Sequence, residues 1–361
     1  MEGSARARRD LVEAVEKESS DKPPAILGKH RQQVEGSLHS ALSLHNPDLQ
    51  TMLQYHLGLS DEYGNPMLSN QGKGLRSSLC IFACKAVGGL SEHALAAAVA
   101  IELIHNFSLI HDDIQDGDRE RRHRPTVWAK WGVPSALLAG NALRGLADGV
   151  LQGLLLKNIK TEVATYAQTI LTQRYLEMIE GQYLDLTYED RLDVTTEEYL
   201  RMISKKTGAL FEASMHLGTL LGTTKARQIE GLRRCGRFLG LAFQARDDIL
   251  GIWGNPDITG KPVGSDILRR KKSLPVVYAF DNAGPATRAK LATIYGDSAL
   301  EPGLVDEVLE ILEQSGAREF SQTLSDEQAE KSLLAIQGQG FPMWAEEQLQ
   351  ALAHYFARRE S

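Results

Sequence analysis

The sequence predicts an all-α protein, built as a single large helical bundle around a central cavity. Apolar residues recur at three- and four-residue spacing, as in Leu171, Tyr175, Met178 and Ile179, and this is the period of a helix. The alternation that indicates strands is nearly absent, and the chain shows no internal repeat of about 20 to 50 residues. We therefore expect one continuous domain of roughly a dozen helices.

Stretches rich in Gly and Pro delimit these helices, because such residues favour turns over helix interiors. They fall at residues 61–66, 87–91, 122–126, 131–135, 221–224, 253–264 and 281–285. Residues 1–30 are charge-mixed and end in a Pro-rich joint, which predicts a charged leader, either flexible or an appended helix. Residues 31–361 then form the helical domain.

Composition narrows the class of protein. Of 361 residues, 42% are hydrophobic and 24% charged, with a net charge of −7, as in ordinary soluble proteins. The acidic balance argues against nucleic acid as a partner. An odd count of three cysteines predicts reduced thiols and a cytoplasmic location. The most apolar run, residues 94–104, contains Glu102 and falls short of the roughly 20 residues that span a bilayer, so we expect no transmembrane segment.

The most informative feature is a group of carboxylates at the end of an apolar segment. Residues 94–110 are apolar on most faces, which predicts a helix buried inside the bundle. Asp112, Asp113 and Asp116 follow at its C-terminal end, where the helix dipole disfavours negative charge. Carboxylates so close raise one another's pKa unless cations hold them ionised. Oxygen ligands without His or Cys favour Mg²⁺, which binds largely through substrate phosphates.

A second apolar segment, residues 238–248, also ends in two acids, Asp247 and Asp248. Gly251 stands where the spacing of the first motif would place a third acid. The alternative for either motif is a solvated acidic helix end, which the apolar approaches disfavour. Two such ends facing across a cavity would form a divided Mg²⁺ site that clamps a diphosphate from both sides.

Cationic residues accompany the two acidic motifs. Arg121 and Arg122 follow Asp116 closely, and further basic stretches lie at residues 71–76, 205–208 and 260–272. Each stretch by itself is more typical of a solvated surface. Their combination with the acids is what predicts a binding site for anionic substrates.

Together these residues resemble the trans-isoprenyl diphosphate synthases, or polyprenyl synthetases, over residues 35–355. The family's DDxxD motif matches Asp112, Asp113 and Asp116, and its arginine pair matches Arg121 and Arg122. The other matched positions are Gly72, Lys73 and Arg76 of a GK-x-x-R element, His105, Gly181, Gln182 and Asp185 of a GQ-x-x-D segment, Lys206, Thr207, Gln244, Lys261 and Lys271. The sequence departs from the family pattern in three places. Gly74 and Ser77 replace an Arg and a Pro beside the early lysine, residues 123–125 replace the usual Gly after the arginine pair, and Gly251 replaces the third acid of the second motif.

The resemblance implies the isoprenoid synthase fold and a Mg²⁺-dependent condensation of isopentenyl diphosphate with an allylic diphosphate. It implies that Asp112, Asp116 and Asp247, supported by Asp113 and Asp248, hold two or three Mg²⁺ ions on the allylic diphosphate. Arg121, Lys206 and Lys261 would neutralise its remaining charge, and Lys73, Arg76, His105 and Arg122 would hold isopentenyl diphosphate. Thr207, Gln244 and Lys271 complete the substrate-binding set. A homodimer, formed through the long helices, is expected from the same resemblance.

Product length in this family depends on bulky side chains four or five residues before the first Asp. Here these positions hold Ser108 and Phe107. The phenyl ring of Phe107 would block long products, and the absence of a second bulky residue argues against the shortest cavity. We therefore expect geranylgeranyl diphosphate, with farnesyl diphosphate as the alternative.

Two rival functions remain open, a terpene cyclase on the same scaffold and a non-catalytic subunit of a heteromeric synthase. The cations expected to bind isopentenyl diphosphate argue against both. For the incomplete second motif, we expect that an acid at position 251 would act only through water or through other ligands, so that its loss is tolerable. The alternative is that Gly251 loosens the following turn. Asp247→Ala should nearly abolish turnover, whereas Gly251→Asp should change it by less than about tenfold, or ~1.4 kcal/mol.

Overall fold

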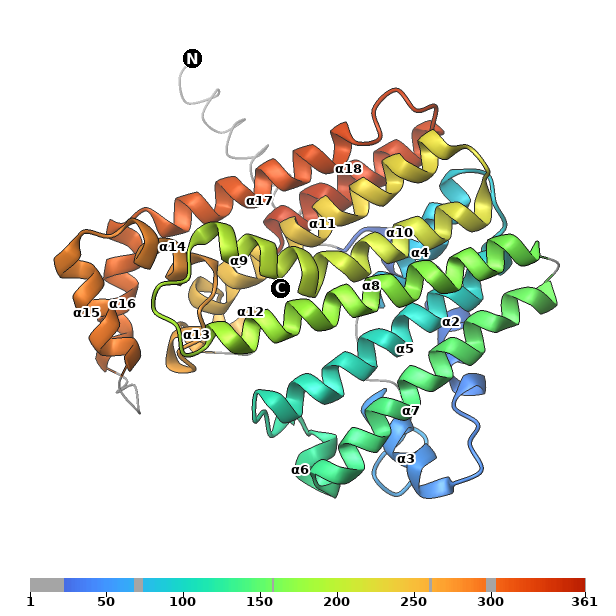
Figure 1. Cartoon of the computed structure of the whole chain (residues 1–361), viewed down its shortest axis with the longest axis horizontal. Helices are drawn as coiled ribbons and strands as arrows, with labels where there is room; N and C mark the ends of the chain where they lie inside the picture. The colour runs from blue at the N-terminus through green and yellow to red at the C-terminus, as the bar shows by residue number, and fades with distance from the viewer. Residues whose placement is uncertain (1–22, 68–73, 158, 260–261, 297–302, 361) are drawn as a thin grey trace, which may run out of the picture.

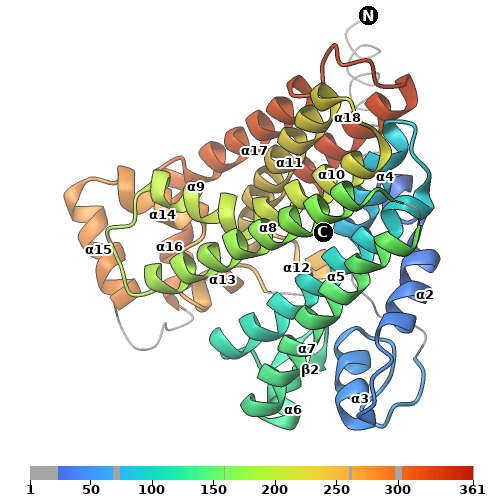
Figure 2. The ribbon, with the colours of Figure 1, turned by 45° about the vertical axis from the view of Figure 1, so that its right-hand side comes forward.

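The computed structural model describes residues 23–67, 74–157, 159–259, 262–296 and 303–360. Within these ranges the all-α prediction is confirmed. The β-structure there consists of a hairpin between β1 (Glu120–Arg121) and β2 (Arg124–Pro125) and a bridge between Ser60 and Pro66. The helices form one bundle, with α11 and α17 along one flank and α7 along the opposite flank (Figures 1 and 2).

The centre of the bundle is α5 (Ser91–Gln115), which packs against α4 (Leu75–Ala86), α7 (Val133–Gln152) and α10 (Ala209–Gly222). Next to α10 lie α8 (Thr161–Tyr188) and α11 (Ala226–Trp253), and α11 also packs against α17 (Ala317–Leu334) and α18 (Met343–Arg358). The two helices that carry the acidic motifs, α5 at its last turns and α11 at Asp247 and Asp248 before its end at Trp253, therefore both contact α10.

The sequence of α5 explains its central position. Alanines such as Ala97 and Ala100 let neighbouring helices approach, while Leu103 and Ile104 are fully buried among them. Among the described residues, α5 is the one helix long and apolar enough to cross a membrane by length and composition, and 61% of that stretch is buried inside the protein. Its place between α4, α7 and α10 is that of a core helix.

The remaining elements surround this centre, and α13 to α16 share a core of their own with the end of α11. Ahead of α4 lie the 3₁₀ helix η1 (Ala25–Leu27), α2 (Arg31–Ala41) and α3 (Pro47–His56). In mid-chain are α6 (Val127–Trp131), the 3₁₀ helix η2 (Gly153–Lys157), α9 (Thr196–Ile203) and the π-helix η3 (Ser204–Gly208). Towards the C-terminus follow α12 (Pro256–Thr259), α13 (Ser265–Leu268), α14 (Leu274–Asn282), α15 (Pro285–Gly296) and α16 (Gly303–Gln314).

The packed region begins before the boundary expected at residue 31. Ile26 and Leu27 of η1 are buried in the core that contains α4 and α18. The Leu27 carbonyl also accepts a hydrogen bond of 3.0 Å from the Ser78 hydroxyl of α4. The start of the predicted leader, residues 1–22, lies outside the described residues.

Candidate active site

A cavity of about 650 Å³ opens between α5, α8, η3, α10 and α11. Carboxylates from both acidic motifs, Asp112 and Asp247, line it together with Lys206. Arg76, His105 and Arg122 line it as well. One cavity therefore brings together an acidic group and a basic group that lie far apart in the sequence.

Burial makes the carboxylates at the acidic end of α5 harder to ionise than usual. Desolvation raises the pKa of Asp112 to about 6, with a further rise from Asp116 and an opposing effect of Lys206. Asp116, the exposed C-cap of α5, belongs to the same cluster, because desolvation and Asp185 raise its pKa and Lys206 lowers it. A cation placed here would favour the ionised form of both carboxylates.

Asp113 points away from its two companions. Its carboxylate is buried and accepts a hydrogen bond of 2.7 Å from Arg121 Nε. Successive helix residues diverge by about 100°, so Asp112 and Asp113 cannot share a face. The metal-ligand role expected of Asp113 does not match this geometry. The pair instead ties Arg121, which lines the cavity, to the end of α5.

Lys206 reaches the cavity from the π-helix η3, where α9 passes into α10. Its Nζ donates to the Asp185 carboxylate on α8. A Cβ at Gly181 of α8 would lie 2.2 Å from the backbone nitrogen of Lys206, so only glycine permits this approach. The GQ-x-x-D segment of α8 therefore supplies both the space for η3 and the partner of Lys206.

The two residues of the second acidic pair, Asp247 and Asp248, also have different surroundings. Asp247 lines the cavity and forms an ion pair with Arg359, close to the C-terminus. Asp248 is buried instead and accepts hydrogen bonds from the Tyr199 hydroxyl, from Gln244 Nε2 at 3.0 Å and from the Leu274 amide at 3.1 Å. These contacts do not match the metal-ligand role expected of Asp248. They anchor α11 to α9 and α14.

Gln244 links the second motif to the π-helix. Its Oε1 accepts a hydrogen bond of 2.7 Å from Thr207 Oγ1 of η3, while its amide nitrogen donates to Asp248. Thr207 and Gln244 both line the cavity. The two residues expected from the sequence to bind substrate, Thr207 and Gln244, are thus hydrogen-bonded to each other.

The basic group is held by mutual contacts. Arg76 Nη1 lies 3.2 Å from His105 Nε2, which accepts the hydrogen bond because arginine can only donate. Burial together with Arg76 and Arg122 holds the pKa of His105 well below its usual range, so the ring is neutral. Burial raises the pKa of Glu102 nearby, while Arg76 and Arg122 lower it.

Arg122 is presented by a tight hairpin. Strands β1 and β2 pair Arg121 with Arg124, which leaves Arg122 and His123 as a two-residue loop. Both have positive φ, 53° and 60°, as a type I′ turn requires. Residues other than Gly, Asn, Asp and His rarely adopt this conformation, so the hairpin holds Arg122 at a cost in backbone strain.

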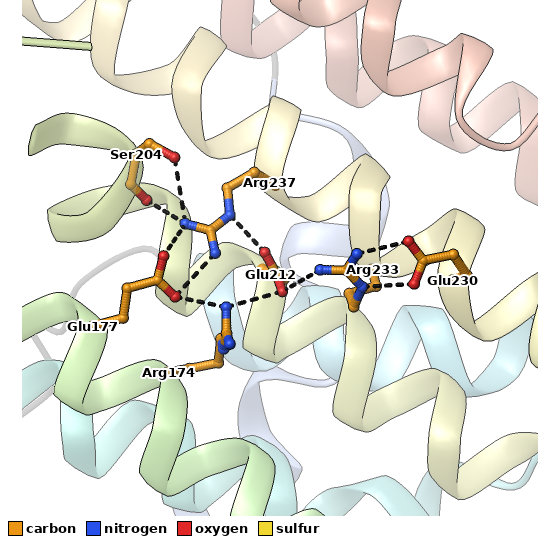
Figure 3. Close-up of polar contacts among 7 residues, drawn as sticks. All are labelled: Arg174, Glu177, Ser204, Glu212, Glu230, Arg233 and Arg237. Carbon is orange, nitrogen blue, oxygen red and sulfur yellow. Dashed lines mark hydrogen bonds and ion pairs between the residues drawn. The ribbon is translucent and has the colours of Figure 1, made fainter. Parts of the chain in front are cut away.

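Behind η3, a network of ion pairs holds the π-helix in place (Figure 3). Arg237 of α11 donates to Glu212 of α10, to Glu177 of α8 and, at 2.6 Å, to the Ser204 carbonyl of η3. Glu212 is nearly fully buried. We call this the Glu212 network, and its members are Arg174, Glu177, Ser204, Glu212, Glu230, Arg233 and Arg237.

Two of the lysines expected at the site, Lys73 and Lys261, lie outside the described residues, as does Gly72. Lys271 is described, and its Nζ lies 3.9 Å from the Asp266 carboxylate. Desolvation lowers the pKa of Lys271, but Asp248, Asp266, Asp185 and Asp116 together raise it above its usual range. Lys271 therefore lies among carboxylates from both acidic helix ends.

Several residues of the site were not expected from the sequence. Glu102 could have been predicted from the sequence, because a charged residue inside an apolar helix must find a buried partner. No sequence pattern indicates the other three residues, because each comes from a different helix or segment that only the fold brings close. They are Tyr199, Arg359 and Asp266. The expectation that Gly251 loosens a turn is wrong, because α11 continues through it to Trp253.

The donor set fits Mg²⁺ that is shared with a substrate. Within the described ranges, no three His, Cys, Asp or Glu side chains converge into a metal cage made by the protein alone. Mg²⁺ typically binds through one or two carboxylates together with substrate phosphates, and Asp112 and Asp247, one from each acidic motif, match that requirement. The Arg359 guanidinium at Asp247 shows that this carboxylate accepts a cationic partner.

The fold and the site together define an all-α prenyltransferase. The sequence pattern of the polyprenyl synthetase family matches residues 60–312. The chain belongs to this family, and its activity is that of a short-chain prenyl diphosphate synthase.

Similar proteins span nearly the whole chain. A (2E,6E)-farnesyl diphosphate synthase of Mycobacterium tuberculosis is 38% identical over 339 residues, which cover 93% of both chains. A geranylgeranyl diphosphate synthase of the same species is 37% identical over 317 residues, 88% of this chain and 89% of the relative. The crystal structure of a polyprenyl synthetase from Streptomyces coelicolor A3(2) superimposes with a TM-score of 0.86 at 37% identity, covering 92% and 98% of the two chains.

Proposed function

We propose that the protein condenses isopentenyl diphosphate with an allylic diphosphate in a Mg²⁺-dependent reaction. The observation that carries this proposal is the division of a single cavity into an acidic group and a basic group. An anionic substrate can meet carboxylates only through metal ions, whereas it meets arginines directly. The cavity is therefore equipped for two diphosphates that bind by different chemistry.

The acidic group binds the allylic substrate. Asp112, Asp116 and Asp247 are its metal-binding residues, and Asp113 and Asp248 hold Arg121 and Gln244 in position. Mg²⁺ bound there supplies charge neutralisation for the departing diphosphate. Lys206 and Arg121 stand at the cavity to bind the remaining diphosphate oxygens, and Asp185 orients Lys206.

The basic group binds isopentenyl diphosphate. Arg76 and Arg122 donate to its diphosphate, and neutral His105 fixes the guanidinium of Arg76. A terpene cyclase has no use for such a second anion site. Met178, Ile179 and Leu210 line the cavity with apolar surface, which keeps water from quenching the allylic cation.

For product length, we propose geranylgeranyl diphosphate. Phe107 lines the cavity and is held edge-on against His111, with the ring centroids 4.8 Å apart. Ser108 lines it too and leaves room beside the ring. One aromatic side chain in the floor supports a product longer than the shortest members of the class but bounded in length. Farnesyl diphosphate is the alternative.

One incubation separates the candidate functions. The protein is supplied with dimethylallyl, geranyl or farnesyl diphosphate, labelled isopentenyl diphosphate and Mg²⁺, and the products are separated by chromatography. Labelled, elongated diphosphate is the expected result. Hydrocarbon formed from the allylic substrate alone would identify a cyclase, and an absence of turnover would identify a non-catalytic subunit.

Phe107→Ala tests the floor of the cavity. Removing the ring should shift the product distribution to longer chains in the same chromatographic assay. Phe320→Ala, which removes a partly buried ring on α17 that does not line the cavity, is the matched control and should leave product length unchanged. An unchanged distribution for Phe107→Ala would remove Phe107 from this role.

We propose in addition that two copies associate through α7 and α8. These adjacent long helices expose Leu137 and Leu138 of α7 and Tyr166 and Leu176 of α8. Burial of this apolar surface in a dimer removes it from water. Light scattering should show a dimer for the wild type and a monomer for Leu138→Glu. Leu334→Glu, at an exposed position of α17, should remain dimeric.

A further inference from the structure

Position 251 has no room for the acid that the second motif lacks. A Cβ built on Gly251 would lie 2.2 Å from Oδ2 and 2.5 Å from Cγ of Asp266. In α11, residue 251 is four positions after Asp247, so a side chain there would leave the helix on nearly the same face. The direction in which a third carboxylate would extend is therefore already filled by a carboxylate.

Asp266 is held there by the docking of α13 against the last turns of α11. The Gly264 amide donates to the Ile252 carbonyl at 2.9 Å, and Ser265 Oγ donates to the Gly251 carbonyl at 3.1 Å. Gly264 has a φ of 73°, which allows the chain to turn into α13. Ile267 on the other side is fully buried, so α13 is fixed from both directions.

The Asp266 carboxylate lacks a close partner in the described part of the chain. The residue is 9% exposed, and Lys271 Nζ lies 3.9 Å from its carboxylate, beyond hydrogen-bond distance. Lys271 also interacts electrostatically with Asp248 and with Asp116 of the first motif. Asp266 thus belongs to the charge cluster that joins the two acidic helix ends.

We propose that Asp266 is the third carboxylate of the second acidic face and replaces the acid missing at position 251. This inference rests on the proposed function. Gly251 contributes by leaving the space that Asp266 occupies, and α13 delivers the carboxylate from outside the motif. Asp266 does not itself line the cavity. Its charge, on the side of α11 that carries Asp247, increases the attraction of this face for divalent cations and orients Lys271. Asp266 is a positioning residue, because its effect on substrate passes through those partners.

Asp266→Asn removes the charge and keeps the shape of the side chain. Binding of methylenediphosphonate in the presence of Mg²⁺, measured by isothermal titration calorimetry, reports on the site without turnover. We expect Asp266→Asn to bind at least about tenfold more weakly than the wild type. Asp306→Asn, in the exposed first turn of α16, is the matched control and should bind like the wild type. Undiminished binding by Asp266→Asn would overturn the proposal.

An exchange of the carboxylate between the two positions tests the same idea without relying on one variant. Gly251→Asp alone should lose binding, because its Cβ collides with Asp266, and this reverses the mild effect expected from the sequence. Combining Gly251→Asp with Asp266→Ala moves the carboxylate into the vacated space and should restore binding above that of Asp266→Ala alone. A double variant no better than Asp266→Ala would contradict the proposal, even if Asp266→Asn did not fold.

The condensation assay separates this inference from the proposed function. Wild-type protein that binds Mg²⁺ and methylenediphosphonate but makes no elongated product would refute the function, while weaker binding by Asp266→Asn would still support the role of Asp266. Elongated product from the wild type together with full binding by Asp266→Asn would refute only the role of Asp266.

Discussion

Two charge clusters lie on opposite sides of the π-helix η3, and they are built in opposite ways. The Glu212 network pairs three glutamates with three arginines, and each charged member contacts at least one partner. At the cavity, cations also lie near the carboxylates, but they do not offset the desolvation of Asp112 and Asp116, whose pKa values stay raised. These cations are Lys206, Arg121, Lys271 and Arg359. The ion pairs of the Glu212 network outweigh the burial of Glu212, whereas those at the cavity do not outweigh the burial of Asp112.

The pKa values express this difference. Burial raises the pKa of Glu212, yet Arg237, Arg233 and Arg174 together lower it below its usual range. Desolvation also raises the pKa of Asp112, and there Lys206 and Arg121 do not offset the rise, so the pKa is about 6. A buried carboxylate by itself therefore does not mark a functional site. The mark is a carboxylate whose compensation must come from outside the protein.

The largest effect should come from neutralising a carboxylate at the cavity. Asp112→Asn should reduce turnover at least ~1000-fold, or ~4 kcal/mol, because metal-assisted departure of the diphosphate is lost. The metal-free protein should at the same time gain about 1 kcal/mol in the free energy of unfolding, since a charge that burial disfavours is removed. Kinetics and urea denaturation at pH 7.5 measure the two effects. A fall in both turnover and the free energy of unfolding would contradict the proposed difference between the two clusters.

Neutralising a carboxylate of the Glu212 network should act in the opposite direction on stability. Glu212→Gln leaves three arginines around an uncharged side chain and should lower the free energy of unfolding by about 3 kcal/mol. Glu230→Gln, at the exposed edge of the same network, should cost less than about 1 kcal/mol. Equal effects of the two substitutions would show that the buried centre of the network contributes no more to stability than its exposed edge.

Arg237 connects the Glu212 network to η3, which carries Lys206, so its substitution tests whether the network supports the cavity. Arg237→Lys cannot keep the fork to Glu212, Glu177 and the Ser204 carbonyl, so η3 and its Lys206 lose their support. We expect turnover to fall about tenfold, or ~1.4 kcal/mol. Arg233→Lys, which loses contacts to Glu212 and Glu230 but not to η3, should keep its turnover.

The smallest effect concerns strain rather than charge. His123→Gly should raise the free energy of unfolding by about 0.5 kcal/mol, because glycine accepts a φ of 60° while its flexibility in the unfolded chain offsets part of the gain. His93→Gly, in the first turn of α5, should instead lower it. A loss of stability in His123→Gly would mean that the hairpin is not strained.

The helical architecture could be predicted because breakers and periodicity are local properties. The breakers at residues 87–91, 221–224 and 281–285 coincide with the ends of α4, α10 and α14. The hairpin at Arg122 was missed, because two-residue strands show no alternation. The π-helix was missed as well, because its extra residue per turn is imposed by packing against Gly181 and Arg237 rather than by composition.

The sequence predicts which residue types form the candidate site better than it predicts where their side chains point. Helix geometry alone implies that adjacent acids diverge by about 100°, so the different directions of Asp112 and Asp113 could have been deduced. The placement of Asp266 against Gly251 could not, because it depends on how the chain returns to α11 after Trp253. The pairing of Arg359 with Asp247 likewise joins residues more than a hundred positions apart.

The burial of α5 also has a consequence for how the chain is synthesised. Its neighbours α4 and α7 emerge from the ribosome close in time to α5, but α10 follows only after α8 and α9 have been made. Until then, a stretch as apolar as a membrane span lacks one of its covering helices. We expect the nascent chain to depend on chaperones during this interval and to be most prone to aggregation when translation stops before residue 222.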